Sequence, residues 1–119
     1  MKNISFNLTT DQIRNRTKTV TRRTGWKTLK VGDVLQACEK CQGLKKGERV
    51  RKICQIRVVE VCQERLAVMV QDPVYGKRDA RLEGFPELSG VEFVNMFCKN
   101  MRVKPEDEVT RIRFEYVGD

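Results

Sequence analysis

The segment from Val109 to Val117 alternates apolar and polar side chains along its whole length. One side of this segment carries Ile112, Phe114 and Tyr116, and the other side carries Arg111, Arg113 and Glu115. Because successive side chains of a strand point to opposite faces, this pattern predicts a closing β-strand with one buried face and one face in water. Such a strand needs partner strands, so the fold must contain a sheet.

Shorter apolar segments supply the other strands. Ile and Val dominate residues 53–61, which we predict as a central strand whose last residues are buried on both faces. Residues 66–70 follow it and could pair with it. Extended backbone is also predicted at 4–6, 17–23 and 34–38. Turns and loops are predicted at 24–25, 31–33, 43–47, 72–73 and 75–76.

Two capping boxes predict helices. Ser89 and Glu92 precede apolar residues spaced four apart from Phe93 to Met101, which is typical of an amphipathic helix. Thr9 and Gln12 form a second box, before a short helix that we expect to end at about residue 16. Strands outnumber helices, so the predicted fold is α+β: a curved sheet or small β-barrel with two or three short helices.

Length and composition limit the class of protein. At 119 residues the chain is predicted to be a single domain, 1–119, with one core. Hydrophobic residues make up 39% and charged residues 34%, which is typical of a soluble globular protein. There is no apolar run long enough for a membrane span and no signal-like start, so we expect a cytoplasmic protein without a membrane partner.

Positive charge is concentrated in the first half of the sequence. Residues 1–60 hold 15 basic and 5 acidic side chains, whereas residues 61–119 hold 9 and 11. The densest stretch, from Arg14 to Lys30, has no acidic residue and contains Trp26. This charge favours a polyanionic partner, and Trp26 beside Lys27 could stack on a base, although such a run can also be a solvated surface. Trp26 could equally pack in the core.

The absence of histidine excludes Ser-His-Asp and Cys-His catalysis and histidine-ligated metals. Five cysteines, an odd number, argue against a secreted disulfide framework. Cys38 and Cys41 form a lone CxxC, and zinc would need two further ligands from Cys54, Cys62 and Cys98. We therefore expect no metal and no cofactor, and cysteines that act as packing residues. A redox role for the CxxC pair stays an alternative.

The chain resembles the ASCH family of PUA-like domains along almost its whole length. The resemblance begins with Lys18-x-x-Thr21 followed by arginine and includes Trp26. It continues through residues 31–33, 43–48, 83–86, 92–94 and 109–112. The cysteines and the Gly-Leu-Lys-Lys-Gly-Glu segment are similar to those of small phage and bacterial members.

This resemblance implies a role connected with RNA or modified nucleosides. In one branch of the family, an amidohydrolase removes an acyl group from the exocyclic nitrogen of cytidine with a Lys, a Thr and a Glu. The matching residues are Lys18, Thr21 and Glu83, which we take as candidate catalytic residues. A lysine with a lowered pKa could activate the threonine hydroxyl. On a regular strand Lys18 and Thr21 would point to opposite faces, so the backbone would have to bend between them.

Binding of RNA or a nucleoside through a basic cleft is the function that we predict from the sequence. The expected contacts, given by charge or stacking, are Arg16, Arg22, Arg23, Trp26 and Lys27. The alternatives are the amidohydrolase and a ribonuclease, and a third possibility is a phage-type protein that binds a host factor. A monomer is the expected oligomeric state.

Overall fold

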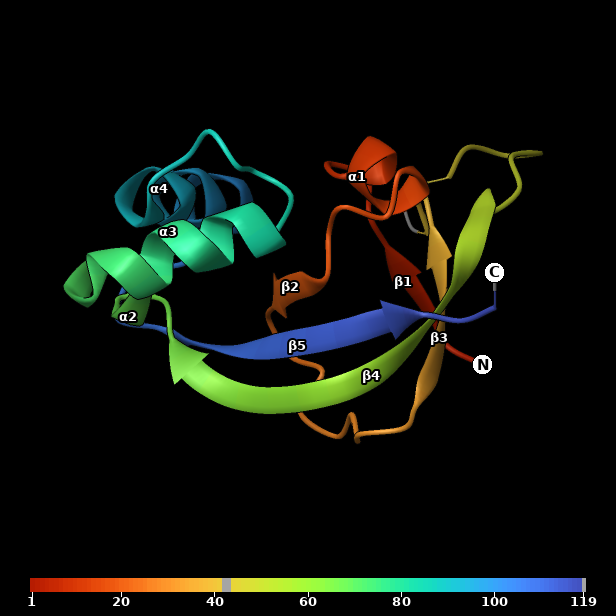
Figure 1. Cartoon of the computed structure of the whole chain (residues 1–119). Coiled ribbons are helices and arrows are strands. Elements are labelled where there is room, and N and C mark those ends of the chain that lie inside the picture. Colours follow the sequence, from red (N-terminus) through yellow and green to blue (C-terminus); the bar gives the residue numbers. More distant parts are fainter. Residues whose placement is uncertain (42–43, 119) are drawn as a thin grey trace.

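Five strands form one mixed, curved sheet in the order β1-β3-β4-β5-β2 (Figure 1). The computed structural model describes residues 1–41 and 44–118. In chain order the strands are β1 (Asn3–Ser5), β2 (Val20–Arg23), β3 (Val34–Cys38), β4 (Lys52–Arg65) and β5 (Glu108–Tyr116). β1 runs parallel to β3, and the other neighbouring pairs are antiparallel. The sheet has two open edges, so the expected α+β curved sheet is confirmed and its closed-barrel form is not.

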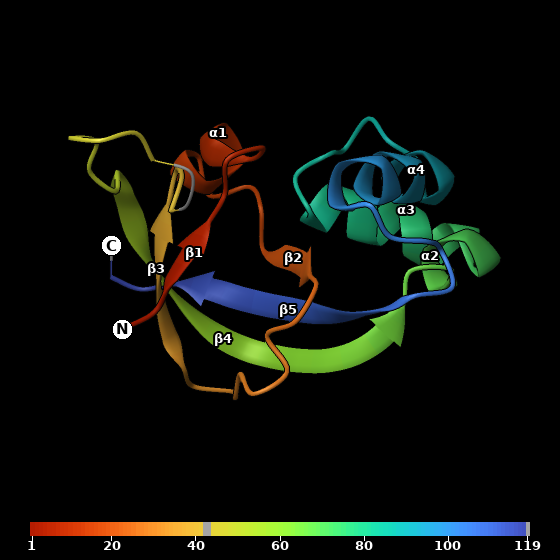
Figure 2. The same cartoon turned by 180° about the vertical axis from the view of Figure 1, so that it is seen from behind.

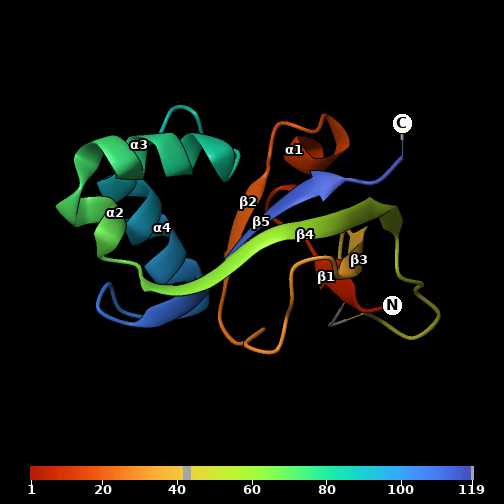
Figure 3. The same ribbon diagram turned by 60° about the horizontal axis from the view of Figure 1, so that its bottom comes forward.

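Helices gather at one end of the long β4–β5 pair. The described residues contain four: α1 (Thr10–Arg14), α2 (Val68–Gln71), α3 (Pro73–Leu82) and α4 (Gly90–Met101). α2, α3 and α4 pack together beyond the end of β4, whereas α1 lies near β1 and β3 (Figures 1 and 2). Seen from below, β4 runs as one curved ribbon between these two regions (Figure 3). None of the helices in the described ranges is long and apolar enough to cross a membrane.

The segment 66–76 differs from the prediction. Residues 66–70, predicted as a possible strand, turn out of β4 into α2, and residues 72–76, predicted as turns, begin α3. Asp72 is the N-cap of α3, since its side chain accepts a hydrogen bond from Tyr75 N at 3.1 Å, and Pro73 follows it. Asp-Pro is therefore a helix start here, because proline fits the first turn of a helix. Gly76 lies inside α3, where an added Cβ would be 2.0 Å from Met69 O.

A helix follows each of the two predicted capping boxes, but only the box of Ser89 and Glu92 forms its hydrogen bonds. Ser89 Oγ accepts from Glu92 N at 3.1 Å, and Glu92 Oε1 accepts from Ser89 N at 2.9 Å. Thr9 makes no side-chain capping bond. The side chain of Gln12 donates instead to Gly84 O at 3.2 Å, so it connects α1 to the loop after α3.

The burial of residues on the two strand faces also differs from the prediction. In β5, Arg113 and Glu115 are exposed as predicted, but Arg111 is buried by side chains of the covering layer. In β4 a bulge between Val58 and Glu60 changes the alternation, and Glu60 is exposed, so the predicted burial on both faces is wrong. Of the predicted loop 43–47, residues 44–47 form no helix or strand, and Gly43 lies outside the described residues.

The buried apolar residues form two clusters rather than the single core that length suggested. One cluster fills the concave side near β1, β3 and the end of β5, and includes Phe6, Ile13 and Phe114. The other joins the helices to the opposite end of the β4–β5 pair, and includes Met69 and Phe93. Residues of both clusters line the pocket described next.

Candidate active site

A pocket of about 350 Å³ opens between the two apolar clusters. Its walls are apolar: Phe6 comes from one cluster, and Phe85, Phe93, Met96 and Phe97 come from or pack against the other. Its polar lining residues are Ser5, Asn7, Thr9, Lys18, Thr21, Arg22, Arg23, Glu83 and Asn100. An apolar cavity of this size with a few converging polar groups is typical of a small-molecule site.

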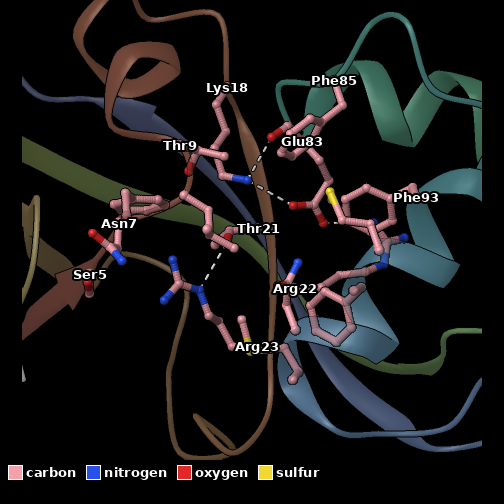
Figure 4. Close-up of a pocket in the computed structure, with 16 residues that line it drawn as sticks. Ser5, Asn7, Thr9, Lys18, Thr21, Arg22, Arg23, Glu83, Phe85 and Phe93 are labelled. Atoms are coloured by element: carbon pink, nitrogen blue, oxygen red, sulfur yellow. Dashed lines mark hydrogen bonds and ion pairs between the residues drawn. The ribbon is translucent and has the colours of Figure 1, made fainter.

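Lys18 and Glu83 form a buried ion pair in this pocket (Figure 4). Lys18 Nζ donates to Glu83 Oε1 at 2.9 Å and to the backbone oxygen of Glu83 at 2.7 Å. Both residues are only 3% exposed. Glu83 is the C-cap of α3, so the end of this helix brings it to a residue 65 positions earlier in the chain.

The ammonium of Lys18 is in an environment that favours its neutral form. Burial lowers the pKa of Lys18, and the positive charges of Arg23 and Arg22 act in the same direction. The charge of Glu83 and its hydrogen bond oppose this effect, but they do not cancel it. Lys18 can therefore lose a proton more readily than an exposed lysine, as a general base requires.

Thr21 shares the pocket with Lys18 despite the spacing of three residues. Lys18 precedes β2, and its backbone N–H donates to Gln12 O at 3.3 Å instead of to a neighbouring strand. The alternation of a regular strand therefore does not apply between the two residues. The structure brings Lys18, Thr21 and Glu83 together in one pocket, with Thr21 Oγ1 accepting from Arg23 Nε at 3.0 Å.

Arg22 is held inside the protein by carboxylates. Its side chain is 0% exposed and contacts Asp79 Oδ2 and Glu64 Oε1 at 2.6 Å and Glu83 Oε2 at 3.1 Å. Burial by itself would lower the pKa of Arg22, but the charges of Glu83 and Asp79 outweigh it and leave this pKa above its ordinary value. Arg22 is thus placed as an internal counter-ion, and the expected contact with nucleic acid does not fit its position.

Three of the expected nucleic-acid contacts lie outside the pocket. Arg16 is exposed and lies over the ring of Tyr116, with its Cζ atom 5.3 Å from the ring centroid. Trp26 is half-buried against the apolar cluster of Phe6, and Lys2 Nζ lies 5.7 Å from its ring centroid. Lys27 is exposed beside it. Of the five residues, Arg22 and Arg23 line the pocket.

The sequence analysis missed the carboxylates behind the pocket. Asp79 is completely buried and accepts hydrogen bonds from Arg22 and from Arg111. Burial alone would raise the pKa of Asp79, but the bonds from Arg111 and the charge of Arg22 hold it below its ordinary value. Asp79 precedes Glu83 by one helical turn, so a correct prediction of α3 would have placed both carboxylates on one face.

The cysteines are spread over the fold. Cys38 is buried, Cys41, Cys54 and Cys98 are partly buried, and Cys62 is exposed, so the expectation that the cysteines act as packing residues does not fit Cys62. Within residues 1–41 and 44–118, no group of three or more Cys, Asp or Glu side chains is arranged to hold a metal ion.

Comparison with solved structures identifies the fold. A crystal structure of an ASCH domain from Lactobacillus crispatus superposes with a TM-score of 0.64 and 16% identity, covering 98% of this chain and 79% of the other. The chain has an ASCH-like fold. A DUF984 protein from Enterococcus faecalis gives the same TM-score at 14% identity, over 98% of this chain and 76% of the other. No protein-family model and no curated protein matches the sequence.

Proposed function

We propose that the ASCH-like pocket binds a cytidine acylated on its exocyclic nitrogen and hydrolyses the amide. The observation that supports this proposal best is the buried Lys18–Glu83 pair in the same pocket as Thr21. A hydroxyl nucleophile, a lysine whose pKa is lowered and a carboxylate are the groups that acyl transfer without histidine requires. The volume of about 350 Å³ suits one small ligand, and the aromatic walls suit a flat base.

The proposed reaction gives each of these groups a role. Neutral Lys18 takes the hydroxyl proton of Thr21 while Oγ1 attacks the acyl carbon. The amine of cytidine then leaves with a proton delivered through the Lys18–Glu83 pair, and the acyl group stays on Thr21 as an ester. Water attacks this ester while the same pair takes its proton, and the pair returns that proton to Thr21 Oγ1 as the carbon–Oγ1 bond breaks and the carboxylic acid is released.

Binding of RNA without turnover is the second candidate. It rests on the excess of positive charge in residues 1–60, with 15 basic and 5 acidic side chains. Another surface hollow, which shares Asn7 with the pocket, is lined by Lys40, Arg49 and Arg51 together with Glu39 and Glu48, so basic residues exceed acidic ones there by one. RNA held by such residues would bind more weakly as salt increases, because phosphate contacts release counterions.

Mass spectrometry of a panel of acylated nucleosides and short RNAs distinguishes the two candidates. We expect the protein to release free cytidine and the carboxylic acid, and Lys18→Ala to abolish this release without unfolding the protein. Lys104→Ala, which removes an exposed lysine outside the pocket, serves as the control and should leave the rate unchanged. Retention of RNA with no product would support the binding module, and an unchanged rate in Lys18→Ala would exclude the proposed chemistry.

A further inference from the structure

Arg23 differs from its neighbour Arg22 in its ion pairs within the part of the chain that the structure describes. Across residues 1–41 and 44–118, no carboxylate oxygen lies within ion-pair distance of Arg23, whereas Arg22 contacts three carboxylates. Arg23 is half-buried and lines the pocket, and its Cζ atom lies 4.8 Å from the ring centroid of Phe6. Burial lowers the pKa of Arg23 to about 10, so the guanidinium stays charged at neutral pH.

One edge of this guanidinium is hydrogen-bonded to Thr21, the candidate nucleophile. Arg23 Nε donates to Thr21 Oγ1 at 3.0 Å. Neither outer nitrogen, Nη1 or Nη2, has a hydrogen-bond acceptor among the residues that the structure describes. Figure 4 shows these nitrogens directed toward the side of the pocket where Ser5 and Asn7 lie. A charged donor group therefore stands open to a ligand beside Thr21.

The geometry of arginine suits two oxygens on one carbon. Nε and the adjacent Nη form a planar fork that matches the two oxygens of a carboxylate. When a threonine Oγ attacks an amide, the former carbonyl oxygen and Oγ become attached to the same carbon. An arginine whose Nε donates a hydrogen bond to Oγ could thus donate a second hydrogen bond from the adjacent Nη to the new oxyanion.

We propose that Arg23 is a catalytic residue whose Nε–Nη edge binds Thr21 Oγ1 and the oxyanion of the tetrahedral intermediate. This inference rests on the proposed hydrolysis. As the Oγ1–carbon bond forms, the carbonyl π electrons move to the oxygen beside Arg23, and the hydroxyl proton goes to Lys18. When the carbon–nitrogen bond breaks, these electrons return to the carbonyl and the amine leaves protonated. Stabilising charge that develops only during the reaction raises kcat rather than tightening substrate binding.

Steady-state kinetics on cytidine acetylated at its exocyclic nitrogen test this role. Arg23→Gln should lower kcat about 100- to 1000-fold, the usual effect of losing an oxyanion donor, with KM changed by less than about 3-fold. Arg23→Lys keeps the charge but loses the fork, and should recover only part of kcat. Lys104→Gln, which changes an exposed basic residue outside the pocket, is the matched control and should equal the wild type. A kcat of Arg23→Gln within about 3-fold of wild type would overturn the proposal.

Titration with acetate gives a readout that does not depend on turnover. Acetate presents two oxygens on one carbon, so it should shift the nitrogen-15 NMR signal of the Arg23 Nε in the wild type, and the control Lys104→Gln should respond in the same way. Arg23→Gln, checked for folding by circular dichroism, should bind no acetate. If no acylated nucleoside is hydrolysed, the proposed function is wrong. Acetate binding that depends on Arg23 would then still show that the Nε–Nη edge of Arg23 binds two oxygens on one carbon. A wild-type spectrum unchanged by acetate would overturn the inference.

Discussion

Arg22 on β2 and Arg111 on β5 are directly paired across the sheet, and both guanidinium groups bind the carboxylate of Asp79. Two like charges at opposing positions would normally destabilise a sheet. Asp79, from α3, lies 2.6 Å from Arg22 Nη2 and 2.8 Å from Arg111 Nε, and so it compensates both. The helical layer and the sheet are therefore joined at this point by charge as well as by apolar packing.

Asp79→Asn should be strongly destabilising. The substitution keeps the shape but leaves two guanidinium groups, one of them fully buried, without their shared anion. We expect the free energy of unfolding to fall by about 3–5 kcal/mol, measured by urea denaturation.

Glu115→Gln is the matched control for this measurement. Glu115 Oε1 pairs with Arg57 Nη1 at 2.9 Å, but both side chains are well exposed. Loss of such a surface pair should cost about 1 kcal/mol or less. Equal costs for Asp79→Asn and Glu115→Gln would contradict the role given to Asp79.

Stability should decrease on acidification because of Asp79. The folded state holds the pKa of Asp79 below its ordinary value, so folding favours the ionised form. This contribution is complete above the unfolded-state pKa of about 3.9 and is lost as the pH falls through the lower folded-state pKa. Urea unfolding at a series of pH values should show a smaller loss in Asp79→Asn than in wild type, and parallel curves would exclude this linkage.

The proposed hydrolysis should become faster as the pH rises. Burial lowers the pKa of Lys18, and the neutral amine is the active base, so kcat/KM should increase up to this pKa, which lies below the ordinary value of about 10.4. Lys18→Arg keeps the positive charge but cannot lose its proton at these pH values, and should be inactive. Activity in Lys18→Arg would mean that Lys18 acts only through its charge.

Gly76→Ala should destabilise the packing of α3 against α2 and α4. The added methyl group would lie 2.0 Å from Met69 O and 2.9 Å from the Cα atom of Gly90, so backbone would have to move. We expect a loss of about 2–3 kcal/mol by thermal or urea unfolding. Val74→Ala, on the same helix at a position 82% exposed, should change stability by about 0.5 kcal/mol or less.

Arg102→Gly should stabilise the protein. Arg102 ends α4 with φ 55° and ψ 45°, a left-handed conformation that costs a side-chain-bearing residue about 1 kcal/mol. Glycine adopts it without this cost, so the free energy of unfolding should rise by about 0.5–1 kcal/mol. Arg102→Ala retains the Cβ atom and should show no such gain.

Much of the sheet was predictable because its strands carry local signals. β3 was predicted with its observed bounds, and the alternation around Phe114 located β5 and the buried side of its central part. α4 was predicted from Ser89 and Glu92, whose capping bonds depend only on neighbours in the sequence. Segments of this kind form their structure from short-range spacing, which a single sequence displays.

The buried charges could not be predicted in the same way. Arg111 follows the polar side of an alternating strand, and only the long-range position of α3 buries it against Asp79. Likewise, Arg22 and Arg23 look equivalent in the sequence, yet α3 and its C-cap place Asp79 and Glu83 in direct contact with Arg22. Lys18, Thr21 and Glu83 were chosen by family resemblance, and it is the fold that brings them into one pocket.

The strand order also determines when the pocket can exist during synthesis of the chain. β1 and β2 occupy opposite edges of the sheet although they come first in the sequence, and β2 pairs only with β5, the last strand. A ribosome would therefore produce Lys18 and Thr21 long before it produces the strand that holds β2 in place. Contacts so distant in sequence slow folding. The segment that contains β2 therefore has no partner strand β5 until β5 has emerged from the ribosome.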